Sequence, residues 1–333
     1  MKESVAAGVL LTVLLFAVSW LHAWQEKSED PAEIPQTHSI EAQTIQSQPS
    51  GLKDRDIALR AKIDGVVQNI TMADYLPGVI RGEMPPDFEL EALKAQAVAE
   101  RTYICYQMAK AAKAAHPDAD VCDNAGCCSA YLSEEEARQK WGDRFAACEE
   151  RVQAAVQGTD GAVMLYEGEP IMAVFHSSSA GKTAACGDVW LADLPYLISV
   201  DSPETADSVP EYYSVKTMTL ASFQQIFTAA YPSADFSGAW ITDRVEDSSG
   251  RVESLSVGGI PISGNEMRRL YGLRSTSFTV DVGEEITFHV TGYGHGVGMS
   301  QYGAEELAKQ GKSWQEILQW YYTDIRIGGY TNR

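Results

Sequence analysis

The amino-acid sequence predicts an α+β fold with mixed short strands and several amphipathic helices. The chain has 333 residues, of which 45% are hydrophobic, so it can bury a sizeable core in one large or two smaller domains. Strand and helix patterns do not alternate regularly, which argues against a parallel α/β sheet. The 26 basic and 46 acidic side chains give a net charge of −20, which argues against a nucleic-acid partner. We therefore expect any polymer bound by this protein to be neutral or sparsely charged.

The N-terminal segment is predicted to anchor the chain in a membrane. This transmembrane anchor covers residues 1–24, and its apolar run at 5–24 is about as long as a bilayer core requires. A cleavable signal peptide is the alternative, but the run extends through Trp20 and Trp24, beyond the usual apolar region of a signal peptide. Because Lys2 precedes the run and mostly acidic side chains follow it, we expect the N-terminus in the cytoplasm and the body outside.

Residues 25–54 are predicted to be a disordered linker. The segment is rich in Gln, Ser, Pro, Glu and Thr and poor in large apolar side chains, so it has little with which to form a core. The body then covers residues 55–333, either as one unit or as two lobes at about 55–160 and 161–333.

The first elements of the body surround a glutamate in a proline-rich segment. Alternating apolar and polar residues predict a strand over residues 64–75. Glu83 follows in a segment that we expect to be a stiff loop, because prolines restrict the backbone around it. A helix is predicted over residues 90–115, with Arg101 beside its apolar stripe. The prolines are Pro77, Pro85 and Pro86, and the stripe consists of Leu90, Leu93, Ala97 and Ile104.

Further helices and strands follow in irregular order. A second helix is predicted over residues 133–156, because Ser133 and Glu136 have the spacing of a capping box. Residues 162–175 indicate a hairpin that delivers His176 to the end of a strand. The remaining predicted elements are strands at 254–257 and 277–280 and helices at 220–231, 264–270 and 314–320.

Three side chains are candidates for acid–base or nucleophilic chemistry. Glu83 has apolar neighbours that would raise its pKa and suit it to general acid/base catalysis, although most loop glutamates are solvated surface residues. His176 and His295 lie in loops rich in glycine or serine, where binding residues concentrate. A Ser-His-Asp site is disfavoured, because no Gly-x-Ser-x-Gly elbow occurs and residues 177–179 offer no single nucleophile.

A cluster of candidate metal ligands follows the first long helix. Its members are His116, Cys122, Cys127 and Cys128, the number of ligands that a closed tetrahedral zinc site requires. We expect zinc in a structural role, because four protein ligands leave no coordination position for a catalytic water. The alternative is one or two disulfides, for instance to Cys105, Cys148 or Cys186.

The glycine-rich segment 294–304 suggests a surface for a polar ligand. Its four glycines alternate with hydrogen-bonding side chains, so the segment contributes little to a core and allows close approach of a ligand. A set of tight turns is the alternative interpretation.

Three segments together carry a family resemblance. The first joins Gly82-Glu83-Met84-Pro85 to the helical residues 90–99 and to Arg101-Thr102-Tyr103. The second is His-Ser-Ser-Ser-Ala-Gly-Lys-Thr at 176–183, and the third is His-Gly-Val-Gly-Met-Ser-Gln-Tyr-Gly-Ala at 295–304. In this order behind an N-terminal anchor, they resemble the stage II sporulation protein D family of membrane-anchored peptidoglycan lytic transglycosylases. Two departures from the family pattern are Ala180, where a second glycine is expected, and Cys127, where some members carry histidine.

The resemblance implies an enzyme that cleaves glycan strands after N-acetylmuramic acid and leaves 1,6-anhydro ends. Glu83 would be its catalytic acid/base, and Arg101 would support the site. The resemblance also implies septal wall remodelling and engulfment during sporulation, with stage II sporulation proteins P and M as partners. The expected substrate-binding residues are Arg101, His176, His295, Ser300, Gln301 and Tyr302. The alternative is a non-catalytic, glycan-binding enhancer of a cell-wall amidase.

Overall fold

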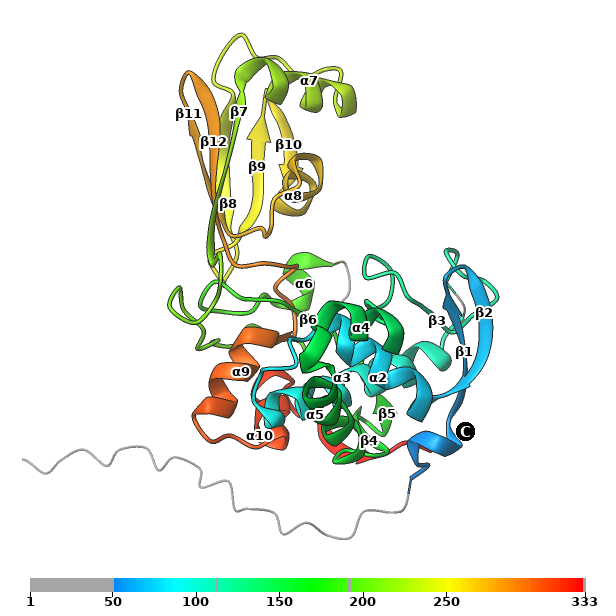
Figure 1. Cartoon of the computed structure of the whole chain (residues 1–333). Coiled ribbons are helices and arrows are strands. Elements are labelled where there is room, and N and C mark those ends of the chain that lie inside the picture. Colours follow the sequence, from blue (N-terminus) through cyan, green and yellow to red (C-terminus); the bar gives the residue numbers. More distant parts are fainter. Residues whose placement is uncertain (1–50, 112, 191–192, 332–333) are drawn as a thin grey trace, which may run out of the picture. The chain divides into compact units, whose positions relative to one another are not determined.

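A computed structural model describes residues 51–331, except 112 and 191–192 (Figure 1). These residues form a mixed α+β fold, which confirms the predicted fold class. The predicted anchor at 1–24 and most of the predicted linker lie outside them. Within the described residues, none of the helices is long and apolar enough to cross a membrane.

A small three-stranded sheet opens the described chain. A short 3₁₀ helix η1 (Asp54–Asp56) precedes β1 (Ala58–Ile63) and β2 (Val66–Thr71), which pair antiparallel, and β3 (Val121–Cys122) adds in parallel to β1. The predicted strand over 64–75 is thus the second strand of a hairpin. It ends at Thr71 because the Thr71 side chain accepts a hydrogen bond from the Asp74 N–H and begins a helix.

In the described part of the chain, the body contains six helices of eight or more residues, with α3 at their centre. The helices are α2 (Met72–Glu83), α3 (Leu90–Met108), α4 (Glu134–Trp141), α5 (Phe145–Gln157), α9 (Gln301–Lys309) and α10 (Trp314–Tyr321). Figure 1 shows α2, α5, α9 and α10 gathered around α3, and all four contact it. Close packing is possible because α3 buries several alanines, namely Ala92, Ala95, Ala97 and Ala99.

Short strands connect these helices and bring distant parts of the chain together. β4 (Ala162–Tyr166) pairs with β5 (Glu169–Pro170) and with β14 (Arg326–Gly329). β6 (Phe175–His176) pairs in parallel with β13 (Met299–Ser300), so the two predicted binding segments are neighbours. A short helix, α6 (Cys186–Val189), follows β6.

Residues 213–291 form a separate hydrophobic core. The elements are β7 (Tyr213–Thr219), α7 (Leu220–Ala230), β8 (Ile241–Glu246), β9 (Val252–Val257), β10 (Ile260–Ser263), α8 (Gly264–Tyr271), β11 (Phe278–Val282) and β12 (Glu285–Thr291). Their core contains stacked aromatic rings such as Phe223 and Tyr271, 4.6 Å apart. The other core takes residues from both sides of this insertion, and also from both sides of the possible division at 160/161.

One predicted loop is helical, and a second one leads into a helix. Glu83 ends α2, although Pro77 lies inside that helix. Pro77 removes one backbone hydrogen bond, but Leu76, Val79 and Ile80 are fully buried, and this packing outweighs the cost of the proline. The glycine-rich segment likewise continues into α9, which the Ser300 side chain caps by accepting the Gly303 N–H.

Other helix boundaries differ in detail from the prediction. The helix predicted over 90–115 ends at Met108. The helix predicted over 133–156 is broken into α4 and α5 by the 3₁₀ turn η2 (Gly142–Arg144), while the Ser133–Glu136 capping box is confirmed.

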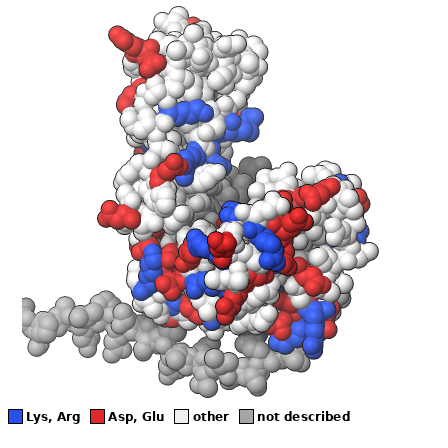
Figure 2. Space-filling model, in the orientation of Figure 1, with Lys and Arg blue, Asp and Glu red and all other residues white. Residues whose placement is uncertain are grey.

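On the face shown in Figure 2, acidic and basic side chains are intermixed over the helical body. Ion pairs of the helical body include Arg138–Glu134, at 2.7 Å, and Arg81–Glu149, at 2.6 Å. The face drawn shows no continuous basic patch of the kind that binds phosphates, in keeping with the net negative charge.

Candidate active site and metal cluster

A cavity of about 370 Å³ opens beside the C-terminal end of α2. Four parts of the chain line it: the end of α2 with the following proline-rich turn, the end of α4, the segment after β6 and the start of α9. The lining residues are Arg81, Gly82, Glu83, Met84, Pro85, Pro86, Phe88, Lys140, Trp141, Ser177, Gln301 and Tyr302. The three segments that carry the family resemblance therefore all reach this cavity.

Direct contacts join Glu83 to the C-terminal segment. The Gln301 Nε2 donates to the backbone carbonyl of Glu83 at 3.0 Å. The Tyr302 N–H donates to the Ser177 carbonyl at 3.0 Å, and the Tyr302 ring packs edge-on against Phe88 with centroids 5.0 Å apart. Residues far away in the sequence thus line the cavity beside Glu83.

The environment of Glu83 favours its protonated form. Burial raises the pKa of the Glu83 carboxyl, while hydrogen bonds from the Ala130 N–H and the Gln301 amide act in the opposite direction. The Ala130 N–H donates to Glu83 Oε1. Among the described residues that line the cavity, Glu83 is the only acid. The arrangement therefore presents one half-buried carboxyl group, close to basic and aromatic side chains, to whatever binds there.

A second glutamate, which the sequence interpretation missed, lies behind Glu83. Glu100 of α3 is fully buried, accepts a hydrogen bond from Ser129 Oγ at 2.9 Å and from Gln96 Nε2 at 3.3 Å, and has no Lys or Arg partner among the described residues. Burial, and secondarily the charge of Glu83, raise the pKa of Glu100 well above its ordinary value. A signal was present, because Glu100 falls between Ala97 and Ile104 on the apolar stripe of the predicted helix.

Arg101, which was expected to bind substrate, is buried and does not line the cavity. Its guanidinium is fully buried and pairs with both carboxylate oxygens of Asp54, at 2.6 and 2.7 Å. Arg101 Nη1 also donates to the Ala162 carbonyl at 3.1 Å. Asp54 was expected in the disordered linker, but this ion pair fixes it against Arg101 of α3.

His176 and His295 lie together but do not line the cavity. Their ring centroids are 5.8 Å apart, and His295 also packs against Trp190 at 5.0 Å. Burial is the main cause of a lowered pKa at both rings. It lowers the pKa of His176 well below its usual value and the pKa of His295 to about 4. Both rings are therefore neutral at neutral pH, and the structure gives them packing roles in place of the expected contact with the cavity.

Ser300 also belongs to a buried network, centred on another carboxyl group that the sequence interpretation missed. Glu204 is 2% exposed and accepts hydrogen bonds from the Ser179 N–H at 2.6 Å, from Ser202 Oγ at 2.5 Å and from Ser300 Oγ. Of the six residues expected to bind substrate, Gln301 and Tyr302 line the cavity.

The geometry also argues against a serine nucleophile. Ser179 Oγ lies 2.6 Å from His176 Nε2, as in a Ser-His pair. However, both residues are buried, and Glu204 contacts the Ser179 backbone instead of the histidine. A substrate would have no access to this serine, and His176 Nδ1 lies 3.2 Å from the Val297 carbonyl, where a triad would place a carboxylate.

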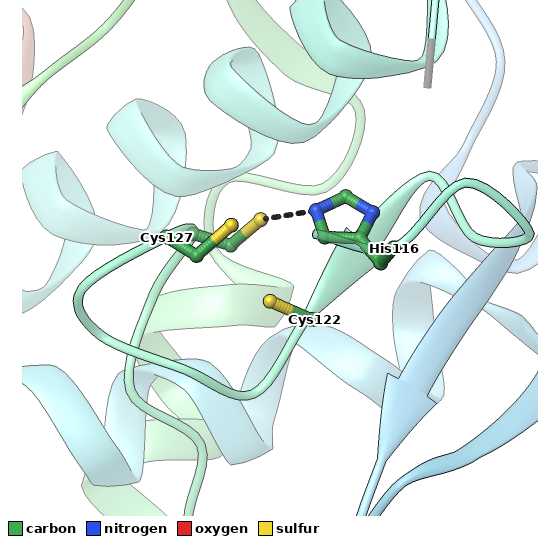
Figure 3. Close-up of side chains that lie close together, drawn as sticks. His116, Cys122 and Cys127 are labelled. Atoms are coloured by element: carbon green, nitrogen blue, oxygen red, sulfur yellow. Dashed lines mark hydrogen bonds between the residues drawn. The ribbon is translucent and has the colours of Figure 1, made fainter. Parts of the chain in front are cut away.

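The predicted metal ligands converge on one point (Figure 3). One ligand atom each from His116, Cys122, Cys127 and Cys128 lies within 4.8 Å of the others. His116 Nδ1 bonds to the Ala119 carbonyl at 3.0 Å, which leaves Nε2 facing the sulfurs, 3.3 Å from Cys128 Sγ. These donors fit a metal ion with nitrogen and sulfur preference.

The cysteines do not form the disulfides that were the alternative. All six lie in the described part of the chain and are free thiols. Burial raises the pKa of the Cys128 thiol to about 12, so its thiolate needs a cation, for which both a metal ion and the nearby Lys113 are suited.

The chain is similar in sequence to proteins of sporulation. A family model described as stage II sporulation protein matches residues 61–166. Stage II sporulation protein D of Bacillus subtilis (strain 168) is 33% identical over 326 residues, which cover 96% of this chain and 92% of that protein. The protein of the same name from Bacillus amyloliquefaciens is 37% identical over 262 residues, covering 78% of this chain and 75% of that protein.

A more distant relative has a different name. The amidase enhancer of Bacillus subtilis (strain 168) is 30% identical over 306 residues, which cover 77% of this chain and 40% of that protein. The nearly full-length match to the first of these relatives, together with the motifs that meet at the Glu83 cavity, shows that this chain belongs to the stage II sporulation protein D family.

Proposed function

We propose that this protein is a peptidoglycan lytic transglycosylase in which Glu83 is both the general acid and the general base. The observation that supports this proposal most is a single carboxyl group of raised pKa in a cavity that contains no second acid among its described lining residues. Ordinary glycosidases place two carboxyl groups across the scissile bond. Glu100 does not supply the second, because it is fully buried.

One carboxyl group suffices when the sugar provides its own nucleophile. Neutral Glu83 donates its proton to the glycosidic oxygen on C1 of N-acetylmuramic acid, and the C1–O bond breaks. The C6 hydroxyl of the same sugar attacks C1, and its proton passes to the Glu83 carboxylate. The product is a 1,6-anhydro ring, no water is consumed, and Glu83 regains its proton. The attached hydroxyl competes with water through its high effective concentration.

The remaining lining residues suit a glycan strand. Phe88, Trp141 and Tyr302 offer aromatic faces for apolar sugar faces, and Gln301 holds the backbone of Glu83. The net charge of −20 is compatible with a sparsely charged polymer.

The test uses purified glycan strands and mass spectrometry of the products. We expect 1,6-anhydro ends from the native protein and none from Glu83→Gln, while Glu150→Gln, which changes an exposed glutamate of α5, remains active. Reducing ends as the main product, or full activity in Glu83→Gln, would contradict the proposal.

The amidase enhancer among the relatives supports a second candidate function. In that case the cavity binds glycan and the protein stimulates a separate cell-wall amidase. Two results would favour the enhancer over the enzyme: glycan binding without turnover, and stimulation of an amidase that is equally strong with the Glu83→Gln variant.

We also propose that the cluster of His116, Cys122, Cys127 and Cys128 holds a structural zinc ion. The four converging donors and the free thiols support this, and no step of the reaction involves the ion. Metal analysis of protein purified without added metal is expected to give close to one zinc per chain. A value near zero, with Cys122 in a disulfide, would argue against it.

For the cellular setting, we propose that residues 1–24 anchor the protein and that its body acts outside the cytoplasmic membrane with stage II sporulation proteins P and M. The apolar run at 5–24 and membership of the family support this. Membrane fractionation and co-purification with each partner test it, and a soluble protein that retains neither partner would contradict it.

A further inference from the structure

Two glutamates of neighbouring helices bind adjacent residues of one segment. The Ala130 N–H donates to Oε1 of Glu83 at the end of α2, and Ser129 Oγ donates to Oε2 of Glu100 in α3 at 2.9 Å. The segment that carries both donors, residues 129–132, is called the clamp segment below. Its position therefore determines where the donor for Glu83 lies.

The clamp segment lies directly against α2. The Leu132 N–H donates to the Gly78 carbonyl at 2.9 Å, and the Tyr131 ring stacks on Tyr75 with centroids 5.4 Å apart. A Cβ atom at Gly82 would lie 2.8 Å from the Ala130 carbonyl carbon, and one at Gly78 would lie 2.1 Å from the Tyr131 ring. Glycine at both positions is therefore needed for this close approach.

Burying a glutamate at position 100, behind this segment, costs free energy of folding. It is fully buried without a cationic partner among the described residues, and the Oε1 of its neighbour Gln96 has no hydrogen-bond partner there either. An apolar side chain would avoid these costs. An apolar side chain could not accept the hydrogen bond from Ser129, whereas Glu100 does.

We propose that Glu100 is a positioning residue that holds Ser129, and through it the Ala130 N–H, in the place that orients the Glu83 carboxyl group. The proposal rests on the proposed function of Glu83. With the N–H of Ala130 on Oε1, the acidic proton of neutral Glu83 is carried on Oε2. The clamp segment thus selects the oxygen that gives the proton to the glycosidic oxygen and receives the proton of the C6 hydroxyl.

Ser129→Ala tests this role with the smallest change to the fold. It removes the hydroxyl group and leaves the backbone donor in place. We expect kcat for release of 1,6-anhydro products to fall by about tenfold, with KM changed by less than about twofold, because orientation of the acid is lost and binding is kept. Ser208→Ala is the matched control, since it removes a hydroxyl hydrogen bond of an exposed turn outside the cavity. Both proteins are compared at equal metal content, because Ser129 follows Cys128.

Two substitutions of Glu100 distinguish positioning from chemistry. Glu100→Gln keeps an acceptor and a donor for Ser129, so we expect it to retain kcat to within about threefold. Glu100→Leu keeps the volume but leaves Ser129 without a partner, so we expect a loss of at least about tenfold. If Glu100→Gln is as inactive as Glu83→Gln, Glu100 takes part in the reaction itself and the proposal is wrong.

A measurement without substrate separates this proposal from the proposed function. Hydrogen exchange of the Ala130 amide is expected to be slow in the native protein and about tenfold faster in folded Ser129→Ala. Native protein that forms no anhydro products would overturn the enzymatic function, while the exchange result would still report on the clamp segment. Unchanged exchange and unchanged kcat in Ser129→Ala would overturn the role of Glu100.

Discussion

The neighbouring residues Ser300 and Gln301 contact two different glutamates, and the two sites differ in almost every respect. Ser300 donates to Glu204, which is 2% exposed and also accepts hydrogen bonds from the Ser179 backbone and from Ser202. Gln301 contacts Glu83, whose carboxyl group faces a cavity and accepts the backbone N–H of Ala130.

The difference shows how one residue type performs two tasks. Several donors around a buried carboxylate stabilise the charge and fix the surrounding loops. Few donors and partial burial favour the neutral acid, which can release a proton to a substrate. On this comparison, Glu204 stabilises the fold, whereas Glu83 has the surroundings that the proposed reaction requires.

The largest expected effect is the loss of catalysis in Glu83→Gln. Removing the acid while keeping the size of the side chain is expected to reduce kcat by about 1,000-fold, which corresponds to about 4 kcal/mol. The thermal unfolding midpoint is expected to stay close to that of the native protein. A large fall in this midpoint would instead show that Glu83 stabilises the fold, as Glu204 does, and would contradict the contrast drawn between them.

Glu204→Ala should show the opposite behaviour. It leaves the Ser179 N–H and two serine hydroxyls without their acceptor, so we expect the free energy of unfolding to fall by about 3 kcal/mol. Denaturant unfolding measures this change, and activity should decrease in step with the folded fraction. A stable variant that has lost kcat would place Glu204 in the catalytic apparatus.

A smaller effect is expected at the aromatic wall of the cavity. Trp141→Ala removes a large aromatic surface from the lining, so we expect KM for glycan to rise by about tenfold, while kcat changes less. Trp320→Ala, which removes a tryptophan that is 43% exposed and outside this cavity, is the control. Equal effects of the two substitutions would argue against glycan binding at the cavity.

The smallest expected effect concerns pH. Glu83 must be protonated to act as an acid, so activity should be lost as the pH rises through its raised pKa. The Gln301 amide lowers this pKa, and Gln301→Ala should therefore move the alkaline limb of the kcat/KM profile to higher pH. The profile of each protein on one glycan substrate checks this, and a shift to lower pH would contradict the assigned cause.

Local signals predicted some parts of this structure well. The capping box of Ser133 and Glu136 marks the true start of α4, because it depends only on neighbouring residues. The four candidate metal ligands were also identified from residue type and spacing, and the structure brings them together.

Tertiary contacts decided the parts that were predicted wrongly. The prolines around Glu83 indicated a loop, but burial of the apolar face of α2 keeps that segment helical. Gly303 lowers the helix propensity of α9, yet a Cβ there would lie 2.0 Å from the Tyr321 hydroxyl, so the position requires glycine for packing. The resemblance implied a role in substrate binding for Arg101, whereas in the structure its guanidinium is buried against Asp54, a residue that was expected in the linker.

The order in which the chain is synthesised determines when the cavity can form. Glu83 is synthesised early, whereas Gln301 and Tyr302, which line the same cavity, are synthesised only after the insertion at 213–291. A growing chain therefore contains its acidic group long before it contains the site. If the protein is a cell-wall lyase as proposed, this order keeps a nascent or truncated chain from cutting glycan until nearly all of it has folded.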